Sequence, residues 1–221
     1  MMKHYDPVRA LTTLIEHKVR FVLIGGLASR AHGSPTITND LDICYERSSE
    51  NLLRLVEALK VLGATLRGAP EGLPFLLDSE TLRRGDHFTF LTDAGPLDIL
   101  GTAGGLGGVA APLRTEPSAP EAANPLKKDG GLGGVAAPLR TEPSAPEAAN
   151  PPKSKTGSLG FDELMRTASE MDFDGLKVWV ATLDDLIDMK TAAGRPKDRV
   201  EVEILGALRE EIDEQRKQSR N

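Results

Sequence analysis

Two aspartates separated by a single residue stand in a short run of strand-forming residues, "DLDICYE" at 40–46. Side chains alternate along a β-strand, so the carboxylates of Asp40 and Asp42 are expected on one face and the apolar Leu41 and Ile43 on the other, in the core. Two like charges side by side cost free energy unless a cation lies between them. Mg²⁺ or Mn²⁺ takes such hard oxygen ligands and completes its shell with waters and phosphates. The pair therefore indicates a metal site, although two surface acids are the alternative for an isolated Asp-x-Asp.

Two glycines precede the aspartates at a position suited to anion binding. Gly25 and Gly26 follow the apolar run "RFVLIG" at 20–25 and come before a short helical pattern at 27–32. Backbone N–H groups at a helix start attract anions, and glycine allows a phosphate to approach the backbone. Thirteen residues separate Gly26 from Asp40, enough for a short helix and a return to the adjacent strand. We therefore expect the turn and the acids at the same end of the sheet; an ordinary strand-to-helix turn is the alternative.

A third acid lies inside an otherwise apolar strand pattern, "PLDIL" at 96–100. An unpaired charge is costly when buried in a strand, so Asp98 either faces solvent or joins a charged site. A third carboxylate facing Asp40 and Asp42 would allow two metal ions. Such an arrangement can activate an attacking hydroxyl and stabilise a leaving pyrophosphate.

The elements that must position these residues follow from apolar periodicity and from turn residues. We expect strands over 20–25, 40–46, 87–92, 95–101 and 176–182. We expect helices over 7–18, 27–32, 49–63, 160–171, 183–194 and 196–218. Together they predict an α+β domain with α/β-like character, in which helices flank a small mixed sheet and the C-terminal part is helical.

A duplicated segment interrupts this pattern. "GGLGGVAAPLRTEPSAPEAANP" occurs at 104–125 and again, identically, at 130–151. The stretch is rich in Gly, Pro and Ala and has no aromatic residue, so it cannot bury enough apolar area to offset its chain entropy. We expect a flexible insertion over 101–158 between two parts of one core, 1–100 and 159–221. A Pro-rich docking segment is the alternative.

Composition narrows the compartment and the partners. The chain has 221 residues and a formal net charge of −6, which gives no support for broad, sequence-independent binding to nucleic acid. Cys44 is the only cysteine, so a disulfide framework is impossible and a cytoplasmic location is expected. The N-terminal stretch does not have the pattern of a signal peptide, and no apolar run is long enough to span a membrane.

The chemistry-bearing residues resemble a known family in their order along the chain. A Gly-Gly pair, a spacer, Asp-x-Asp and a later aspartate on a neighbouring strand resemble the nucleotidyltransferase superfamily that includes DNA polymerase β. Many members have Gly-Ser where this chain has Gly25-Gly26, so no serine role carries over to this turn. A second block, "LDDLIDMKTAAGRPKD" at 183–198, resembles the Lys-x-x-Ala-x-Arg-x-x-Asp region of AbiEii-type nucleotidyltransferases, the toxins of some bacterial toxin–antitoxin pairs. The resemblance covers residues 20–100 and 175–210.

The resemblance implies a role for each matching residue. Asp40 and Asp42 would bind metal, and Asp98 would complete the site and help to activate the acceptor. The glycine turn would face the nucleotide, and Lys190 and Arg195 would contact its phosphates. Lysine offers a point charge and arginine a fork suited to phosphate. Basic residues that merely complement the C-terminus of a helix are the alternative for these two.

The resulting expectation is an enzyme that moves a nucleoside monophosphate from an NTP such as ATP to an acceptor hydroxyl and releases pyrophosphate. If the chain is a toxin, the acceptor would be a tRNA 3′ end or a protein, and an antitoxin partner would exist. A small molecule such as an aminoglycoside or lincosamide antibiotic is the second possible acceptor. A non-catalytic nucleotide-binding regulatory partner is the alternative from another class, and none of the three readings involves a membrane.

Overall fold

The apolar run before the two glycines forms an inner strand of the sheet. β1 (Phe21–Ile24) is buried at all four positions, which is why its sequence shows no alternation of apolar and polar residues. It pairs antiparallel with β2 (Leu41–Tyr45) on one side and parallel with β9 (Leu176–Val180) on the other. The strand that carries two of the aspartates therefore lies beside the strand that leads into the glycine turn.

The computed structural model describes residues 5–69, 75–103 and 159–219, all of them within one compact unit. In these residues a mixed sheet has seven strands in the order β3-β4-β5-β2-β1-β9-β8. The pairs β2–β5 and β1–β9 are parallel and the others are antiparallel. The remaining strands of this sheet are β3 (Thr65–Leu66), β4 (His87–Thr92), β5 (Gly95–Leu100) and β8 (Ser169–Phe173).

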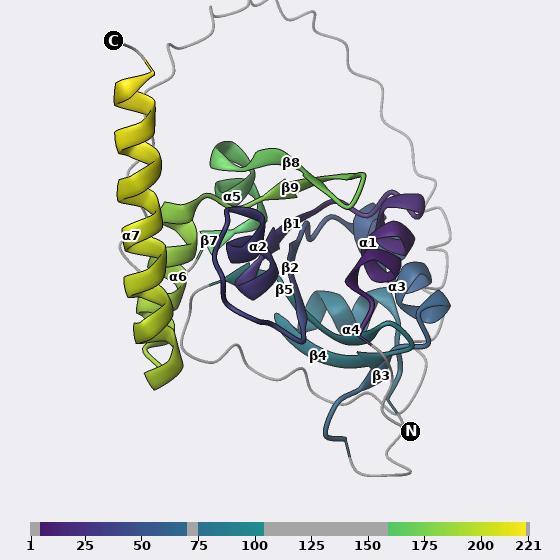
Figure 1. Ribbon diagram of the computed structural model, residues 1–221. Coiled ribbons are helices and arrows are strands. Elements are labelled where there is room, and N and C mark those ends of the chain that lie inside the picture. The colour runs from purple at the N-terminus through teal and green to yellow at the C-terminus, as the bar shows by residue number, and fades with distance from the viewer. Residues whose placement is uncertain (1–4, 70–74, 104–158, 220–221) are drawn as a thin grey trace, which may run out of the picture. The chain divides into compact units, whose positions relative to one another are not determined.

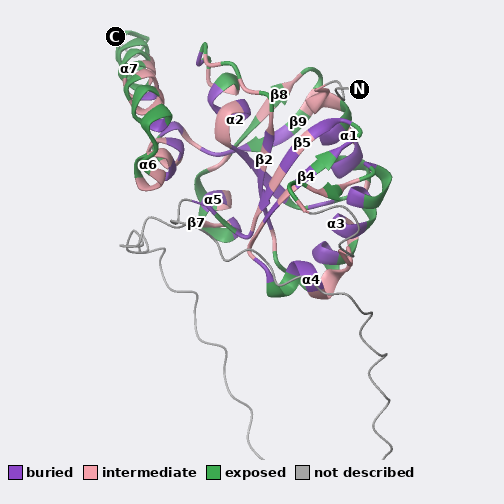
Figure 2. Cartoon of the chain, turned by 90° about the horizontal axis from the view of Figure 1, so that it is seen from below, coloured by how far each residue is buried: buried purple, intermediate pink, exposed green. Residues whose placement is uncertain are grey.

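Helices lie on both sides of the sheet. In Figures 1 and 2, α1 (Pro7–Glu16) and α3 (Ser49–Val61) lie on the other side of the sheet from α2 (Gly25–Ala31) and α5 (Phe161–Thr167). α3 packs against α1 and against α4 (Ser79–Arg84), while α2 and α5 pack against β1. This arrangement confirms the predicted α+β class with a mixed sheet flanked by helices.

Two consecutive helices form the C-terminal part. α6 (Leu183–Ala193) begins after Thr182, whose hydroxyl accepts from the Asp185 N–H, and ends at Gly194 with φ 63°. α7 (Pro196–Gln218) begins with a proline and packs mainly on α6. Within the described part of the chain, no helix is both long enough and apolar enough to cross a membrane.

The predicted helix over 160–171 is wrong in its second half. The helix ends at Thr167, and residues 169–173 form β8, which pairs antiparallel with β9. The hairpin turns at Asp174-Gly175, both with positive φ. Asp-Gly favours this kind of two-residue hairpin turn, and that signal decides the structure over the helix-like spacing of the preceding apolar residues.

The predicted insertion over 101–158 lies outside the described residues except for its first three. On either side of the segment 104–158, β6 (Thr102–Ala103) pairs antiparallel with β7 (Leu159–Gly160). The residues that flank that segment therefore pair in a short two-stranded sheet.

A buried asparagine ties the first turn of α3 to the central strands. Asn51 has no exposed surface, and its side-chain oxygen accepts from the Arg20 N–H at 2.7 Å. Its amide donates to the carbonyl oxygens of Arg20 at 3.0 Å and Glu46 at 2.8 Å. One side chain thus satisfies backbone groups just before β1 and just after β2.

Replacing this asparagine by alanine should destabilise the fold strongly. Asn51→Ala leaves one backbone N–H and two carbonyl groups without their partner, so the free energy of unfolding should fall by on the order of 3 kcal/mol. Urea unfolding followed by circular dichroism measures the change. Glu57→Ala, on the exposed face of the same helix, is the matched control. Equal midpoints for the two variants would contradict the role given to Asn51.

Candidate active site

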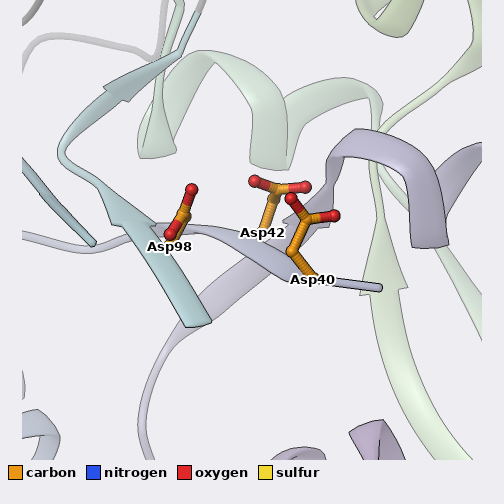
Figure 3. Close-up of side chains that lie close together, drawn as sticks. All are labelled: Asp40, Asp42 and Asp98. Atoms are coloured by element: carbon orange, nitrogen blue, oxygen red, sulfur yellow. The ribbon is translucent and has the colours of Figure 1, made fainter. Parts of the chain in front are cut away.

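The three aspartates singled out in the sequence converge on one face of the sheet (Figure 3). β2 and β5 run parallel, and their register places Asp42 directly beside Asp98. Asp40 lies immediately before β2. One carboxylate oxygen from each residue can be chosen so that all three lie within 4.8 Å of one another. Leu41 and Ile43 point to the opposite face and are buried in the core.

The glycine turn packs closely against one of these carboxylates. β1 pairs with β2 so that Ile24 lies opposite Asp42, which brings Gly25 to the same level. Gly25 has φ +67°, and a Cβ built there would lie 2.0 Å from Oδ2 of Asp42. A Cβ on Gly26 would lie 2.7 Å from the Cβ of Thr38. Both positions therefore exclude larger residues, and α2 begins at the first glycine rather than at residue 27 as expected.

Asp40 is held from two directions by residues that the sequence did not single out. The Thr38 hydroxyl donates to a carboxylate oxygen of Asp40. The Tyr5 hydroxyl donates to the Asp40 carbonyl oxygen at 2.9 Å, from a segment that precedes α1. Thr38 is two residues away, so its spacing was visible in the sequence. Nothing in the sequence around Tyr5 pointed to a contact 35 positions away.

Asp98 has a cationic partner of its own. One guanidinium nitrogen of Arg67 donates to both carboxylate oxygens of Asp98, at 2.9 and 3.1 Å. Arg67 follows β3, and its backbone N–H bonds to the Thr89 carbonyl oxygen on β4. His87, also on β4, lies close enough for its charge to act on Asp98. Neither residue could be identified from the sequence, because the proximity of both to Asp98 depends on the order of strands across the sheet.

Burial and mutual repulsion perturb the carboxyl groups. Burial, with the charges of Asp40 and Asp98 beside it, raises the pKa of Asp42 to about 7. The charge of Lys190 and a hydrogen bond from the Gly26 backbone oppose this rise. Burial also raises the pKa of Asp98, against the charges of Arg67 and His87. In the absence of a cation, the site is therefore short of positive charge.

The two basic residues of the second motif lie on the same cleft but are already paired. Lys190, near the end of α6, forms a largely buried ion pair with Glu201 of α7. Arg195 donates from Nε to Asp198 at 2.7 Å, and Asp198 is buried in the first turn of α7. This hydrogen bond raises the pKa of the Arg195 guanidinium, and the charge of Asp42 acts in the same direction. The charges of Lys190 and Arg195 therefore both interact favourably with the Asp42 carboxylate.

These residues line one cleft of about 1270 Å³. Its lining includes the glycine turn, the three aspartates, Arg67 just after β3, His87 at the start of β4, and residues of α6 and α7. The volume is large enough for a nucleoside triphosphate together with part of a second substrate. All of the residues predicted for the site, including Lys190 and Arg195, therefore lie around a single opening.

Comparisons with known proteins give a distant structural likeness. No family model matches the sequence, and no curated protein matches it. Among the solved structures that match is one from Thermotoga maritima described as a "putative nucleotidyltransferase". It is 13% identical, with a TM-score of 0.42, over 96% of this chain and 97% of that chain. At this identity and TM-score the likeness does not indicate what this chain does.

Substituting the first glycine should test how tightly the turn and Asp42 are packed. Gly25→Ala introduces both a left-handed φ and a clash with the Asp42 carboxylate. Gly175→Ala in the β8–β9 turn is the matched control, because Gly175 has φ +84° and open space around it. We expect Gly175→Ala to lose about 1 to 2 kcal/mol of unfolding free energy. Gly25→Ala should lose about 1 to 3 kcal/mol more, because of the clash. Urea unfolding of both variants measures the difference, and equal losses would argue against the close approach.

The raised pKa of Asp42 predicts an unusual dependence of stability on pH. In the metal-free folded protein this group keeps its proton up to about pH 7, whereas in the unfolded chain it releases the proton near pH 4. The folded state binds more protons between these values, so this group lowers the unfolding free energy as pH rises from about 4 to about 7. Asp98, whose pKa is also raised, contributes in the same sense.

Urea unfolding at a series of pH values in EDTA checks this dependence. Asp42→Asn has no proton to release and should show a shallower fall than the wild type. Asp174→Asn, at an exposed turn position outside the cleft, should follow the wild type. A wild-type slope no steeper than that of Asp42→Asn would be inconsistent with a perturbed carboxyl at position 42.

Proposed function

We propose that this chain is a metal-dependent nucleotidyltransferase that moves a nucleoside monophosphate from an NTP to an acceptor hydroxyl. The observation that carries the proposal is the convergence of three carboxylates, within 4.8 Å, beside a glycine turn at the floor of a cleft. Carboxylates brought this close repel one another. Burial, together with that repulsion, raises the pKa of Asp42. Three convergent carboxylates that are short of positive charge offer hard oxygen donors, which suit a divalent cation.

The residues present fit Mg²⁺ or Mn²⁺. Asp40, Asp42 and Asp98 would hold the cation, and Arg67 would keep Asp98 oriented from the side. Bound there, a divalent cation polarises phosphoryl oxygens and neutralises the charge that develops during transfer. The Thr38 and Tyr5 hydrogen bonds fix the loop that carries Asp40, so the first of the three carboxylates is held before any ligand arrives.

The proposed reaction exchanges one P–O bond for another. The acceptor oxygen forms a bond to the α-phosphorus of the NTP. The bond from that phosphorus to the bridging oxygen of the β-phosphate breaks, and pyrophosphate leaves with the electron pair. The hydroxyl proton passes to the carboxylate of Asp98, which lies at the end of the triad farthest from the glycine turn along the strand order. Orientation of the two substrates supplies much of the rate increase in such a transfer.

The nucleotide phosphates are assigned to the side of the cleft that carries Lys190 and Arg195. Asp198 holds the Arg195 guanidinium through both Nε and Nη2, and the remaining Nη edge of the fork is left for a ligand, since 61% of that side chain is accessible. Arginine in this geometry suits bidentate contact with phosphate. Lys190 shares its charge with Glu201, so a phosphate would compete with that carboxylate for the ammonium group.

The biological setting is part of the proposal. The AbiEii-like motif at 183–198 supports a toxin of a toxin–antitoxin pair, acting in the cytoplasm on a tRNA 3′ end or on a protein. A small antibiotic-like molecule is the second class of acceptor. Growth arrest on induced expression, relieved by the product of a neighbouring gene, would favour the toxin; unimpaired growth would favour the small-molecule enzyme.

Transfer of labelled nucleotide tests the activity itself. The full chain is incubated with labelled NTPs, Mg²⁺ or Mn²⁺, and either a tRNA pool or a set of small acceptors. Label should enter one acceptor class, stop when EDTA is added, and fall by roughly 100-fold or more in Asp42→Ala, because a ligand of the cation is lost. Asp174→Asn is the matched control and should keep full activity. Label incorporation that survives in Asp42→Ala would refute the assignment, and nucleotide binding without transfer to any acceptor would favour a regulatory role.

A further inference from the structure

The strand order divides the cleft into two halves around the aspartates. Gly25 follows β1, and beyond it come Asp42 on β2 and Asp98 on β5, followed by β4 and β3. α6, which carries Lys190, packs against α2 and so lies on the glycine side. The half beyond Asp98 is bounded by Arg67 and His87. An acceptor that attacks opposite the leaving pyrophosphate has to occupy this second half.

Arg67 has donors to spare in that half. A guanidinium carries five N–H donors on three nitrogens. Among the described residues its side chain bonds only to Asp98, and only through one nitrogen. The side chain is 42% accessible, so the other nitrogens can reach a ligand in the cleft. The same side chain therefore holds the third carboxylate and presents unused donors beside it.

His87 offers a second unused polar group in the same half. Thr89 pairs with Asp98 across β4 and β5, so the side chain two residues earlier projects on the same face as the carboxylate. His87 lines the cleft, and its Nε2 atom is buried without a hydrogen-bond partner among the described residues. Buried ring nitrogens normally have a hydrogen-bond partner. Nε2 of His87 has none, so its hydrogen-bonding capacity is left for a substrate oxygen.

We propose that Arg67 and His87 form the acceptor subsite, which takes a sugar hydroxyl flanked by an anionic phosphate group. This inference rests on the proposed function and adds the chemical class of the acceptor. The hydroxyl lies at Asp98, the phosphate oxygens accept from the free N–H groups of Arg67, and His87 bonds to a neighbouring sugar oxygen. The free N–H groups of Arg67 donate to anionic oxygens and offer no acceptor to the ammonium groups of an aminoglycoside-like substrate.

Equilibrium binding tests the subsite without turnover. The first probe is a short single-stranded RNA with a 5′ fluorophore and a free 3′ hydroxyl, read by anisotropy in Mg²⁺. The second probe is a fluorescent ATP analogue for the nucleotide side. Arg67→Met and Lys190→Met are compared with Arg216→Met, which removes the same charge from an exposed position outside the cleft.

The inference expects the two cleft variants to act on different probes. Arg67→Met should raise the Kd of the RNA about tenfold, the usual effect of losing a charge-assisted hydrogen bond, and leave the Kd of the ATP analogue unchanged. Lys190→Met should do the reverse, and Arg216→Met should change neither. Arg67→Lys should weaken RNA binding less than Arg67→Met. His87→Gln, which keeps a polar group near the Nε2 position, should bind RNA better than His87→Phe.

Several outcomes would overturn the subsite. They are an RNA that the wild type does not bind, an RNA Kd that is the same in Arg67→Met and Arg216→Met, and equal effects of both cleft variants on both probes. Ribose 5-phosphate and ribose, used as competitors, test whether the phosphate group itself is recognised. If it is, ribose 5-phosphate should displace the RNA and ribose should not.

This failure is distinguishable from failure of the proposed function. A wild-type chain that transfers label in the assay above, with an acceptor KM unchanged by Arg67→Met, would keep the activity and lose the subsite. A positioning role for Arg67 through Asp98 alone would lower kcat and leave both the acceptor KM and the RNA Kd unchanged, which would also overturn the contact with the acceptor.

Discussion

Electrostatic repulsion among three carboxylates is the constraint on which the rest of the site depends. Adjacent strands force Asp42 and Asp98 side by side, and the loop before β2 adds Asp40. The fold holds this arrangement with backbone pairing and hydrogen bonds, because Lys190 and Arg195 are paired with acids outside the triad. A chain that keeps such repulsion in its folded state loses stability to it, and a bound divalent ion would relieve that loss.

The cations that surround the triad are each engaged with an acid. Arg67 bonds to Asp98, Lys190 to Glu201 and Arg195 to Asp198. Apart from Lys197, the cations that line the cleft around the triad are therefore held in preformed ion pairs. Under the proposed function, incoming phosphates would exchange partners with these carboxylates, so discrimination among ligands would depend on geometry more than on net attraction. The acidic composition of the chain and a site for a polyanion are compatible for this reason.

The sequence sufficed for elements whose signal is local. Such signals are readable within a few residues: the alternation around Asp42, the glycines at the start of α2 and the caps of α3 and α6. The structure has these elements close to their expected bounds. The position of β8 was missed because the helical spacing over 160–171 was followed and the Asp-Gly turn at 174–175 was not considered. Arg67, His87 and Tyr5 could not be placed, because their proximity to the aspartates depends on strand order and register, which no single segment encodes.

The pairing of β6 with β7 separates chain length from active-site geometry. Ala103 and Leu159 face each other across two antiparallel strands, so the intervening sequence leaves and re-enters the sheet at one point. Copies of a tandem unit can then accumulate or disappear between generations without moving Asp98 relative to its neighbours. The β6–β7 pair thus makes the register of β2 and β5 independent of the length of the sequence between Ala103 and Leu159.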